Sequence, residues 1–378
     1  MRTREDLGTY DDIAAAAVRT TGLDDFGGSE HEEGLRILVD DLASPAAGLT
    51  PRGNYLQRAQ VKSALVGRLL SQHGMAEHPS YAAVEITRPV FVVGLPRTGT
   101  TALHRLLTAD ERHQGLELWL TEYPQPRPPR ESWPEDPVFA GIQAAYADHH
   151  VTHPEFLGIH YIDAASVEEC WRLLRQSGKS IGFESLAHVP TYAAWLAEQD
   201  WTDAYERHRA NLQLIGLNDT DKRWVLKNPS HLAALDSLMR VYPDALIVVT
   251  HRDPVTSVAS ACSLSAEATA GWSTTFVGET IGRTQLEMLS RSWHRFAESR
   301  QRYDAAQFLD VDYTDFTTDP VGTTRAIYEA FDLGWTPEVE AAVTALDAES
   351  RRGGRRPAHR YDLADYGLTE GQVRAAFA

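Results

Sequence analysis

The segment VFVVGLPRTGTT, residues 90–101, is the strongest indicator of the fold of this chain. Its first four residues are apolar, which is typical of a buried strand, and a loop bounded by Gly94 and Gly99 follows. Leucines at 103, 106 and 107 then recur at helical spacing. A strand, a glycine-bounded loop and a helix together place backbone N–H groups and a helix N-terminus around an anion. The stretch therefore predicts a phosphate-binding loop.

The residues of this loop restrict the ligand that it can bind. The two glycines have the spacing of a Walker A loop, but Thr100 stands where a nucleoside triphosphatase has lysine. A hydroxyl cannot neutralise a β- or γ-phosphate as an ammonium does, and Arg97 is the one cation in the loop. We expect this loop to bind a phosphate-like group, but we do not expect the protein to be an ordinary ATPase or GTPase.

Three later segments repeat the arrangement of strand followed by helix. Apolar runs predict further buried strands over residues 223–226, 245–250 and 308–311. An N-cap residue followed by proline opens the next helix at 228–229, 253–254 and 319–320. This alternation predicts an α/β fold, a P-loop-like parallel sheet of four or five strands with helices on both faces. Ligands of such sheets bind at the carboxyl ends of the strands.

The composition restricts the class of function. The 378 residues suffice for one or two domains with a large core. A net charge of −17 argues against a nucleic-acid partner, because counterion release needs a cationic face. Cys170 and Cys262 fit a reducing compartment. No run approaches the ~18 apolar residues of a membrane span, and no secretory signal is visible, so we expect a cytoplasmic protein with no membrane span.

The chain divides into a helical N-terminal region and a core domain. Residues 1–85 show helical apolar spacing and no chemical motif, so we expect a helical layer packed on the core or on a second subunit, which leaves a homo-oligomer open. The core domain spans residues 86–378. Between its first two expected strands lie residues without a clear strand pattern. At about 115–215 we expect a helical insertion that covers the acceptor pocket.

Lys227 and His231 stand at the end of the second expected strand and the start of its helix. Taken alone, the lysine is better explained by solvation and the histidine by a structural role. Both residues are expected at the same end of the sheet as the predicted phosphate-binding loop, residues 94–99, which we call the anion loop. In that position both gain a chemical interpretation. A histidine can take a proton from an acceptor hydroxyl, and a lysine can stabilise charge on a departing phosphate oxygen.

Two further groups of residues are candidates for anion binding. Arg252 ends the third expected strand and Ser260 lies on the next helix, so the pair can clamp a second phosphate; the alternative is a local salt bridge with Asp253 and a polar helix face. The segment RRGGRR, residues 351–356, ends in Arg355 and Arg356. It fits either an anion-binding loop or a solvated loop.

A metal site is not expected. His149, His153 and His160 lack the glutamate and carboxylate set that a metalloprotease pattern needs. His160 is also compatible with a place in the acceptor pocket. Glu117 and Glu122 follow the first helix of the nucleotide unit and can face the site or the surface.

These motifs, in this order, resemble those of sulfotransferases that use 3′-phosphoadenosine 5′-phosphosulfate (PAPS). Residues 96–101, PRTGTT, resemble the 5′-phosphosulfate loop of the family, and Arg252 with Ser260 resembles its 3′-phosphate motif. Residues 224–227, WVLK, resemble the strand that ends in a catalytic lysine. Over roughly residues 20–378 the chain is similar to a large bacterial branch of the superfamily. The segments that carry this likeness are GLPRTGTTALHRLL, RWVLKNPSHL, YPDALIVVTHRDP and HRYDLADYGL.

The resemblance implies transfer of a sulfuryl group from PAPS to a hydroxyl of a small-molecule acceptor, with 3′-phosphoadenosine 5′-phosphate (PAP) as product and no metal required. It assigns the 5′-phosphosulfate to Arg97 and to the N–H groups of Thr98, Gly99, Thr100 and Thr101. Arg252, Ser260, Arg355 and Arg356 then bind the remaining donor groups. Lys227 stabilises the leaving side.

His231 is the preferred base and Glu117 the second, although cytosolic sulfotransferases place the histidine two residues after the lysine and this chain places it four after. A P-loop small-molecule kinase and a non-catalytic nucleotide-binding protein remain the alternatives.

Overall fold

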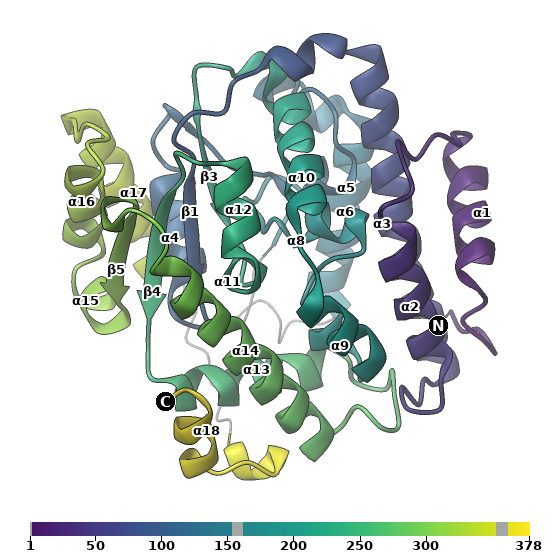
Figure 1. The fold of residues 1–378 in the computed structure, drawn as a ribbon. Helices are drawn as coiled ribbons and strands as arrows, with labels where there is room; N and C mark the ends of the chain where they lie inside the picture. Colours follow the sequence, from purple (N-terminus) through teal and green to yellow (C-terminus); the bar gives the residue numbers. More distant parts are fainter. Residues whose placement is uncertain (1, 153–161, 353–361) are drawn as a thin grey trace.

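The strand at residues 90–94 lies at the centre of a parallel sheet. The computed structural model describes residues 2–152, 162–352 and 362–378. The sheet has five strands in the order β2-β3-β1-β4-β5, all parallel (Figure 1). Its strands are β1 (Val90–Gly94), β2 (His113–Gln114), β3 (Arg223–Lys227), β4 (Leu246–His251) and β5 (Phe308–Asp312). The expected α/β fold with a parallel sheet is confirmed.

The edge strand β2 differs from the expectation. It lies in the segment that shows no strand pattern in the sequence, and it pairs with β3 through His113 opposite Arg223. Its two residues are polar, so no apolar run marks it. Pairing with a long neighbouring strand, rather than local propensity, makes this segment a strand.

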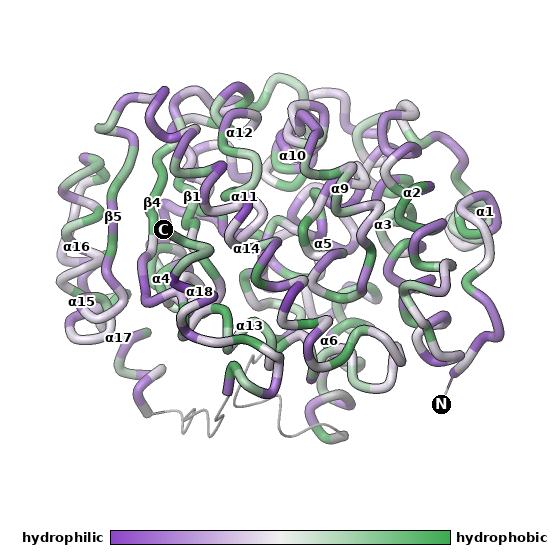
Figure 2. The backbone as a smooth tube through the Cα atoms, turned by 60° about the horizontal axis from the view of Figure 1, so that its bottom comes forward, coloured by the Kyte–Doolittle hydropathy of each residue, from purple (hydrophilic) through white to green (hydrophobic). Residues whose placement is uncertain are grey.

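Alternate side chains of β1 pack on opposite faces of the sheet, because successive strand residues point to opposite sides. Phe91 and Val93 belong to the larger apolar core, whereas Val90 and Val92 belong to the smaller one. Both faces are therefore covered, and Figure 2 shows the strands β1 and β4 as mainly hydrophobic segments in the interior.

The smaller core lies under α4 (Thr100–Leu107), α16 (Pro320–Ala330) and α17 (Pro337–Arg352), with α15 (Tyr313–Thr318) beside them. The larger core lies under the helices α10 (Thr202–Ile215), α11 (Ser230–Ala233), α12 (Leu235–Val241), α13 (Pro254–Ala268) and α14 (Glu279–Arg300). Asp253 caps α13 as expected, since its carboxylate accepts from the Val255 N–H. In α11 the N-cap residue is Pro229, one position after the expected Asn228, although the Asn228 amide oxygen accepts from the Ser230 N–H at 2.6 Å.

The N-terminal helices α1 (Tyr10–Thr21), α2 (Glu32–Ala43) and α3 (Pro51–Glu77) form the layer at the right of Figure 1. α2 packs on α9, and α3 packs on α5, α8 and α10. Their apolar side chains, such as Leu38 and Leu65, belong to the same continuous core as Phe91. The expected helical N-terminal layer thus meets the sheet mainly through the insertion.

The insertion between β2 and β3 is helical, as expected. Its helices are α5 (Leu118–Glu122), α6 (Pro137–Thr152), α8 (Trp171–Leu174), α9 (Pro190–Glu198) and α10. Short 3-10 turns join them at η2 (Arg130–Glu135), η3 (Arg175–Ser177), η4 (Glu184–Leu186) and η5 (Gly216–Asn218).

Three further 3-10 turns lie outside the insertion, at η1 (Pro79–Ala83), η6 (Ala305–Gln307) and η7 (Leu363–Tyr366). The C-terminal helix α18 (Glu370–Ala376) packs on α13 and α14. Among the described residues, no helix combines the length and the apolar character that crossing a membrane requires.

Candidate functional site

The loop after β1 closes through backbone geometry that glycine makes possible. Arg97 and Gly99 both have positive φ, 69° and 89°. A Cβ added to Gly94 would lie 2.2 Å from the Thr250 hydroxyl and 2.8 Å from that of Thr98, so no larger residue fits there. The two threonine hydroxyls hydrogen-bond to each other at 2.6 Å, which fastens the loop to β4. Thr98 also donates to the Leu95 carbonyl at 2.7 Å.

Helix α4 begins directly after this loop without a side-chain cap. Gly99 is its N-cap residue and has no side chain that could hydrogen-bond to the N–H groups of the first turn. These N–H groups and the helix dipole favour an anion at this end. The expected succession of strand, loop and helix is therefore present in the fold, and phosphate binding by it stays a prediction.

Lys227 joins the end of β3 to this helix. Its ammonium donates to the Thr101 hydroxyl at 3.0 Å and lies 2.5 Å from a carboxylate oxygen of Glu169. The Lys227 side chain is only 3% exposed. Asn228 donates to the other oxygen of Glu169 at 3.3 Å. A cation is thus held beside the anion loop by neighbours on two sides.

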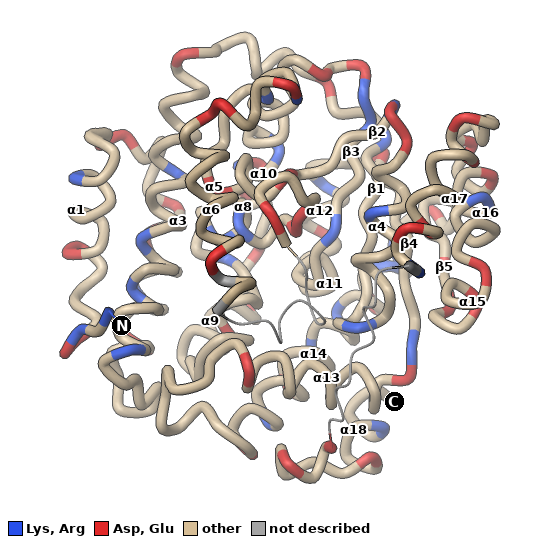
Figure 3. The backbone as a smooth tube through the Cα atoms, turned by 180° about the vertical axis from the view of Figure 1, so that it is seen from behind, with Lys and Arg blue, Asp and Glu red and all other residues tan. Residues whose placement is uncertain are grey.

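Arg252 is held on the other side of the loop. Its guanidinium donates to the carbonyl of Arg97 at 2.9 Å and lies 4.0 Å from the centroid of the Tyr313 ring. Seen from behind in Figure 3, basic positions lie at the end of β4. Ser260 is buried on α13, two helical turns beyond its start. The structure brings Arg97 and Arg252 into direct contact.

His231 occupies a different environment. Its side chain is fully buried, and its Nδ1 hydrogen-bonds to the Tyr205 hydroxyl at 2.7 Å. The ring packs edge-on against Phe91 at 5.0 Å between centroids. Burial, with the nearby His208, holds its pKa well below the ordinary value. The imidazole therefore stays neutral in the core, and this burial disfavours the expected contact with an acceptor.

Glu117 is engaged in a structural ion pair. One of its carboxylate oxygens lies 3.0 and 3.1 Å from two nitrogens of the Arg127 guanidinium. Arg127 also binds Asp219 at 2.8 Å and Gln114 at 2.6 Å. The pair thus ties α5 to β2 and to the turn before β3. Among the described residues, the Glu117 side chain pairs with Arg127 and not with Lys227 or the anion loop.

Comparison with known proteins identifies this architecture. The family model described as "Sulfotransferase family" matches residues 89–337, which include the loop, Lys227 and Arg252. The chain belongs to the sulfotransferase family.

Two solved structures resemble this sulfotransferase over nearly its whole length. Sulfotransferase STF1 from Mycobacterium tuberculosis H37Rv is 51% identical, with a TM-score of 0.92 over 99% of this chain and 100% of that one. Sulfotransferase STF9 from Mycobacterium avium is 29% identical, with a TM-score of 0.88 over 98% and 95%. The N-terminal layer and the insertion therefore belong to a shared architecture.

A curated relative is named omega-hydroxy-beta-dihydromenaquinone-9 sulfotransferase Stf3, from Mycobacterium bovis. It is 26% identical over 265 residues, which are 65% of this chain and 63% of that protein. The chain thus spans less than two thirds of the length of this relative.

Some predicted residues of this sulfotransferase lie outside the described residues. Arg355, Arg356, His153 and His160 fall in residues 153–161 and 353–361. Elsewhere in the described chain, no group of three or more His, Cys, Asp or Glu side chains could hold a metal ion.

Sequence reasoning missed two residues at this site, Glu169 and Tyr313. Tyr313 directly follows β5, so its position at a strand end offered a signal. Glu169 had none, because it lies in the insertion, 58 residues before Lys227.

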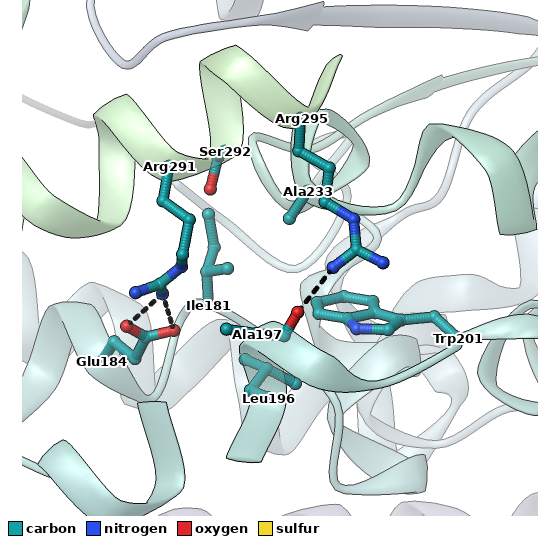
Figure 4. Close-up of a pocket in the computed structure, with 9 residues that line it drawn as sticks. All are labelled: Ile181, Glu184, Leu196, Ala197, Trp201, Ala233, Arg291, Ser292 and Arg295. Atoms are coloured by element: carbon teal, nitrogen blue, oxygen red, sulfur yellow. Dashed lines mark hydrogen bonds and ion pairs between the residues drawn. The ribbon is translucent and has the colours of Figure 1, made fainter. Parts of the chain in front are cut away.

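A cavity elsewhere in the molecule lies between helices, among them α9 and α14 (Figure 4). Arg291 of α14 binds both carboxylate oxygens of Glu184 at 2.9 and 2.7 Å, and Arg295 donates to the Ala197 carbonyl at 3.0 Å. Its lining is Ile181, Glu184, Leu196, Ala197, Trp201, Ala233, Arg291, Ser292 and Arg295. None of the predicted donor-binding residues belongs to this set, so the cavity is separate from the anion loop.

Proposed function

We propose that this sulfotransferase transfers a sulfuryl group from PAPS to a hydroxyl of a small-molecule acceptor and releases PAP. The observation that carries the proposal is the hydrogen bond from Arg252 to the Arg97 carbonyl, 2.9 Å long. It fixes a second cationic group beside the anion loop. A donor with phosphates at both its 5′ and 3′ positions matches two adjacent anion sites, whereas ATP has no 3′-phosphate.

The residues present fit such a donor. The side-chain-free Gly94 and the uncapped start of α4 form a cradle of backbone N–H groups for a phosphosulfate. PAPS would supply an activated sulfuryl group. Arg97 and the N–H groups of Thr98–Thr101 would hold its 5′ end, and Arg252 with Ser260 its 3′-phosphate. Arg355 and Arg356 remain predicted donor contacts.

Lys227 provides the charge that the reaction needs. Its ammonium lies beside Thr101 and is almost fully buried, where a charge acts more strongly than in water. It would stabilise the negative charge that develops on the phosphate oxygen as the sulfuryl group leaves. The protein's remaining task is to align the acceptor oxygen with the sulfur. We also propose that this reaction requires no metal ion.

For the acceptor we propose a lipid-like alcohol. The support is the name of the curated relative Stf3, an omega-hydroxy-menaquinone sulfotransferase. Geranylgeraniol, a simple prenyl alcohol, is the first probe. A cytoplasmic location is proposed with it, because Cys170 and Cys262 are both free thiols, which fits a reducing compartment.

Calorimetric titration with PAP, ATP and AMP in metal-free buffer tests the donor. We expect binding of PAP only, weakened about 10- to 100-fold by Arg252→Ala, because a hydrogen bond to a charged group contributes about 1.5–3 kcal/mol. The matched control is Arg302→Ala, which removes an exposed arginine from an ion pair with Asp236 and leaves PAP binding unchanged.

Two results would contradict the proposal. Binding of ATP that depends on Mg²⁺, with equal or weaker binding of PAP, would indicate a small-molecule kinase. PAP binding without any conversion of PAPS in an acceptor panel would indicate a nucleotide-binding protein without catalysis.

A further inference from the structure

Glu169 is the carboxylate that directly meets the cation of the site. Its Oε1 lies 2.5 Å from the Lys227 ammonium, and its Oε2 accepts from Asn228 at 3.3 Å. The backbone holds this arrangement, since the Cys170 N–H donates to the Lys227 carbonyl at 3.0 Å. The carboxylate is thus fixed by two side chains and by the strand end itself.

The Thr101 hydroxyl, the Lys227 ammonium and the Glu169 carboxylate form a row of three contacting groups at the site. The Lys227 ammonium contacts Thr101, in the first turn of α4, and Glu169 together. The lysine side chain is 3% exposed, whereas that of Glu169 is 25% exposed. The carboxylate is therefore the more accessible partner, and it comes from the insertion that we expect to cover the acceptor.

The two bases expected from the sequence have partners away from Lys227, although the buried Nε2 of His231 has no hydrogen-bond partner among the described residues. His231 lies in the core with its Nδ1 bound to Tyr205, and Glu117 pairs with Arg127. Within the described parts of the chain, the Lys227 ammonium contacts Thr101 and Glu169 and neither of these two side chains. A general base must reach the proton that it removes, so geometry favours the carboxylate at the lysine.

We infer that Glu169 is the general base of the reaction, an inference that rests on the proposed sulfuryl transfer. The acceptor oxygen forms a bond to sulfur while the bond from sulfur to the 5′-phosphate oxygen breaks. The electron pair of that bond passes to the phosphate oxygen of PAP, where Lys227 stabilises it. The hydroxyl proton passes to the Glu169 carboxylate and then to solvent. No atom changes its oxidation state.

The first test uses Glu169→Gln, which keeps the side-chain shape and removes the basic oxygen. Conversion of radiolabelled PAPS is followed with water and with geranylgeraniol as acceptors. We expect turnover to fall about 100-fold or more, since general bases contribute about 10²- to 10⁴-fold. PAP affinity, measured by calorimetry, stays within about threefold of the wild type, because Glu169 lies beyond the lysine from the donor loop. Glu298→Gln, a change at an exposed glutamate, is the matched control.

A second variant separates a base from a residue that only positions Lys227. In Glu169→Ala, added acetate and formate should restore turnover, and acetate more than formate because it is the stronger base. A carboxylate that only holds the lysine predicts no such order.

The inference is overturned if Glu169→Gln keeps turnover within about threefold, or if rescue of Glu169→Ala is absent or does not follow carboxylate basicity. Failure of the proposed function looks different, since the wild type itself would then convert no PAPS, whether or not it binds PAP.

Discussion

The Lys227 ammonium and the Thr101 hydroxyl are hydrogen-bonded at 3.0 Å, across 126 residues of sequence. The bond joins the end of β3 to the first turn of α4, so the cation lies at the N-terminus of the helix that is suited to an anion. In the resting molecule the ammonium is shared between this hydroxyl and Glu169. A donor that binds at the loop would therefore meet a lysine that is already in place.

Replacing this lysine should abolish chemistry more than binding. We expect Lys227→Met to lower PAPS turnover by about 100-fold or more, because the methionine keeps the volume and loses the charge that stabilises the leaving oxygen. Turnover assays with PAP calorimetry check this. The control is Lys222→Met, at a more exposed lysine that pairs with Asp219. Full activity of Lys227→Met would contradict the role.

The glycine before the loop should tolerate no side chain. In Gly94→Ala the new methyl would lie 2.2 Å from the Thr250 hydroxyl, so the loop or β4 must shift. We expect a loss of about 1–3 kcal/mol in the free energy of unfolding, together with weakened PAP binding. Urea denaturation and calorimetry measure the two effects.

A second glycine supplies the control for that variant. Gly141 lies in α6, and nothing stands within 4 Å of a Cβ built there. Gly141→Ala should stabilise the protein by up to about 1 kcal/mol, because alanine favours a helix over glycine. Equal destabilisation by both changes would show that the contact at Thr250 does not matter.

Buried histidines should make the protein sensitive to acid. Burial lowers the pKa of His208 to about 3, and burial with the charge of Lys227 lowers that of His104 to about 3. Below about pH 6.5 the unfolded chain binds protons that the folded chain does not, so the free energy of unfolding decreases as the pH is lowered. Each such histidine contributes a slope of about 1.4 kcal/mol per pH unit between about 6.5 and 3.

The measurement is the urea midpoint from pH 7 to pH 5. His208→Phe should flatten this dependence, although it also removes the partner of the Tyr242 hydroxyl and so lowers stability at pH 7. The same change at exposed His78 should leave the dependence as in the wild type. An unchanged slope in His208→Phe would refute the assignment.

One partly buried carboxylate holds two arginines together. Glu122 of α5 pairs with Arg172 and with Arg175, whose side chain is 2% exposed, and burial lowers the pKa of Arg175 to about 10. Glu122→Gln should cost about 3–5 kcal/mol of unfolding free energy, because it leaves buried charge without its counter-charge.

The control for this change is an exposed ion pair. Glu370→Gln removes a carboxylate that lies 3.7 Å from Arg374 and should change stability by less than about 1 kcal/mol. A loss at Glu122 no larger than this would mean that water or other groups compensate the arginines. Chemical denaturation of both variants decides between the two.

Much of the fold was predictable because its information is local. A buried strand followed by Gly94, Gly99 and a helix is encoded by neighbouring residues, and so are the hydrogen bonds that Asp253 and Asn228 accept at helix starts. Parallel strands then place Lys227 and Arg252 at one edge of the sheet without further information. For the same reason the predictions of the α/β class and of the segment of strand, loop and helix were correct. The two-residue strand β2 was not predicted, because only its pairing with β3 makes it a strand.

Local sequence was sufficient to predict the anion loop, the strand ends and the residue types that meet there. Which carboxylate meets Lys227 depends instead on the packing of segments that are distant in the chain. His231 is near the lysine in sequence, but the first turn after β3 carries its ring into the core, to Tyr205. Glu169 is distant in sequence, but the packing of the insertion brings it to 2.5 Å. Spacing along a chain fixes a side chain's direction only within one element, whereas contacts between elements depend on how the whole insertion packs.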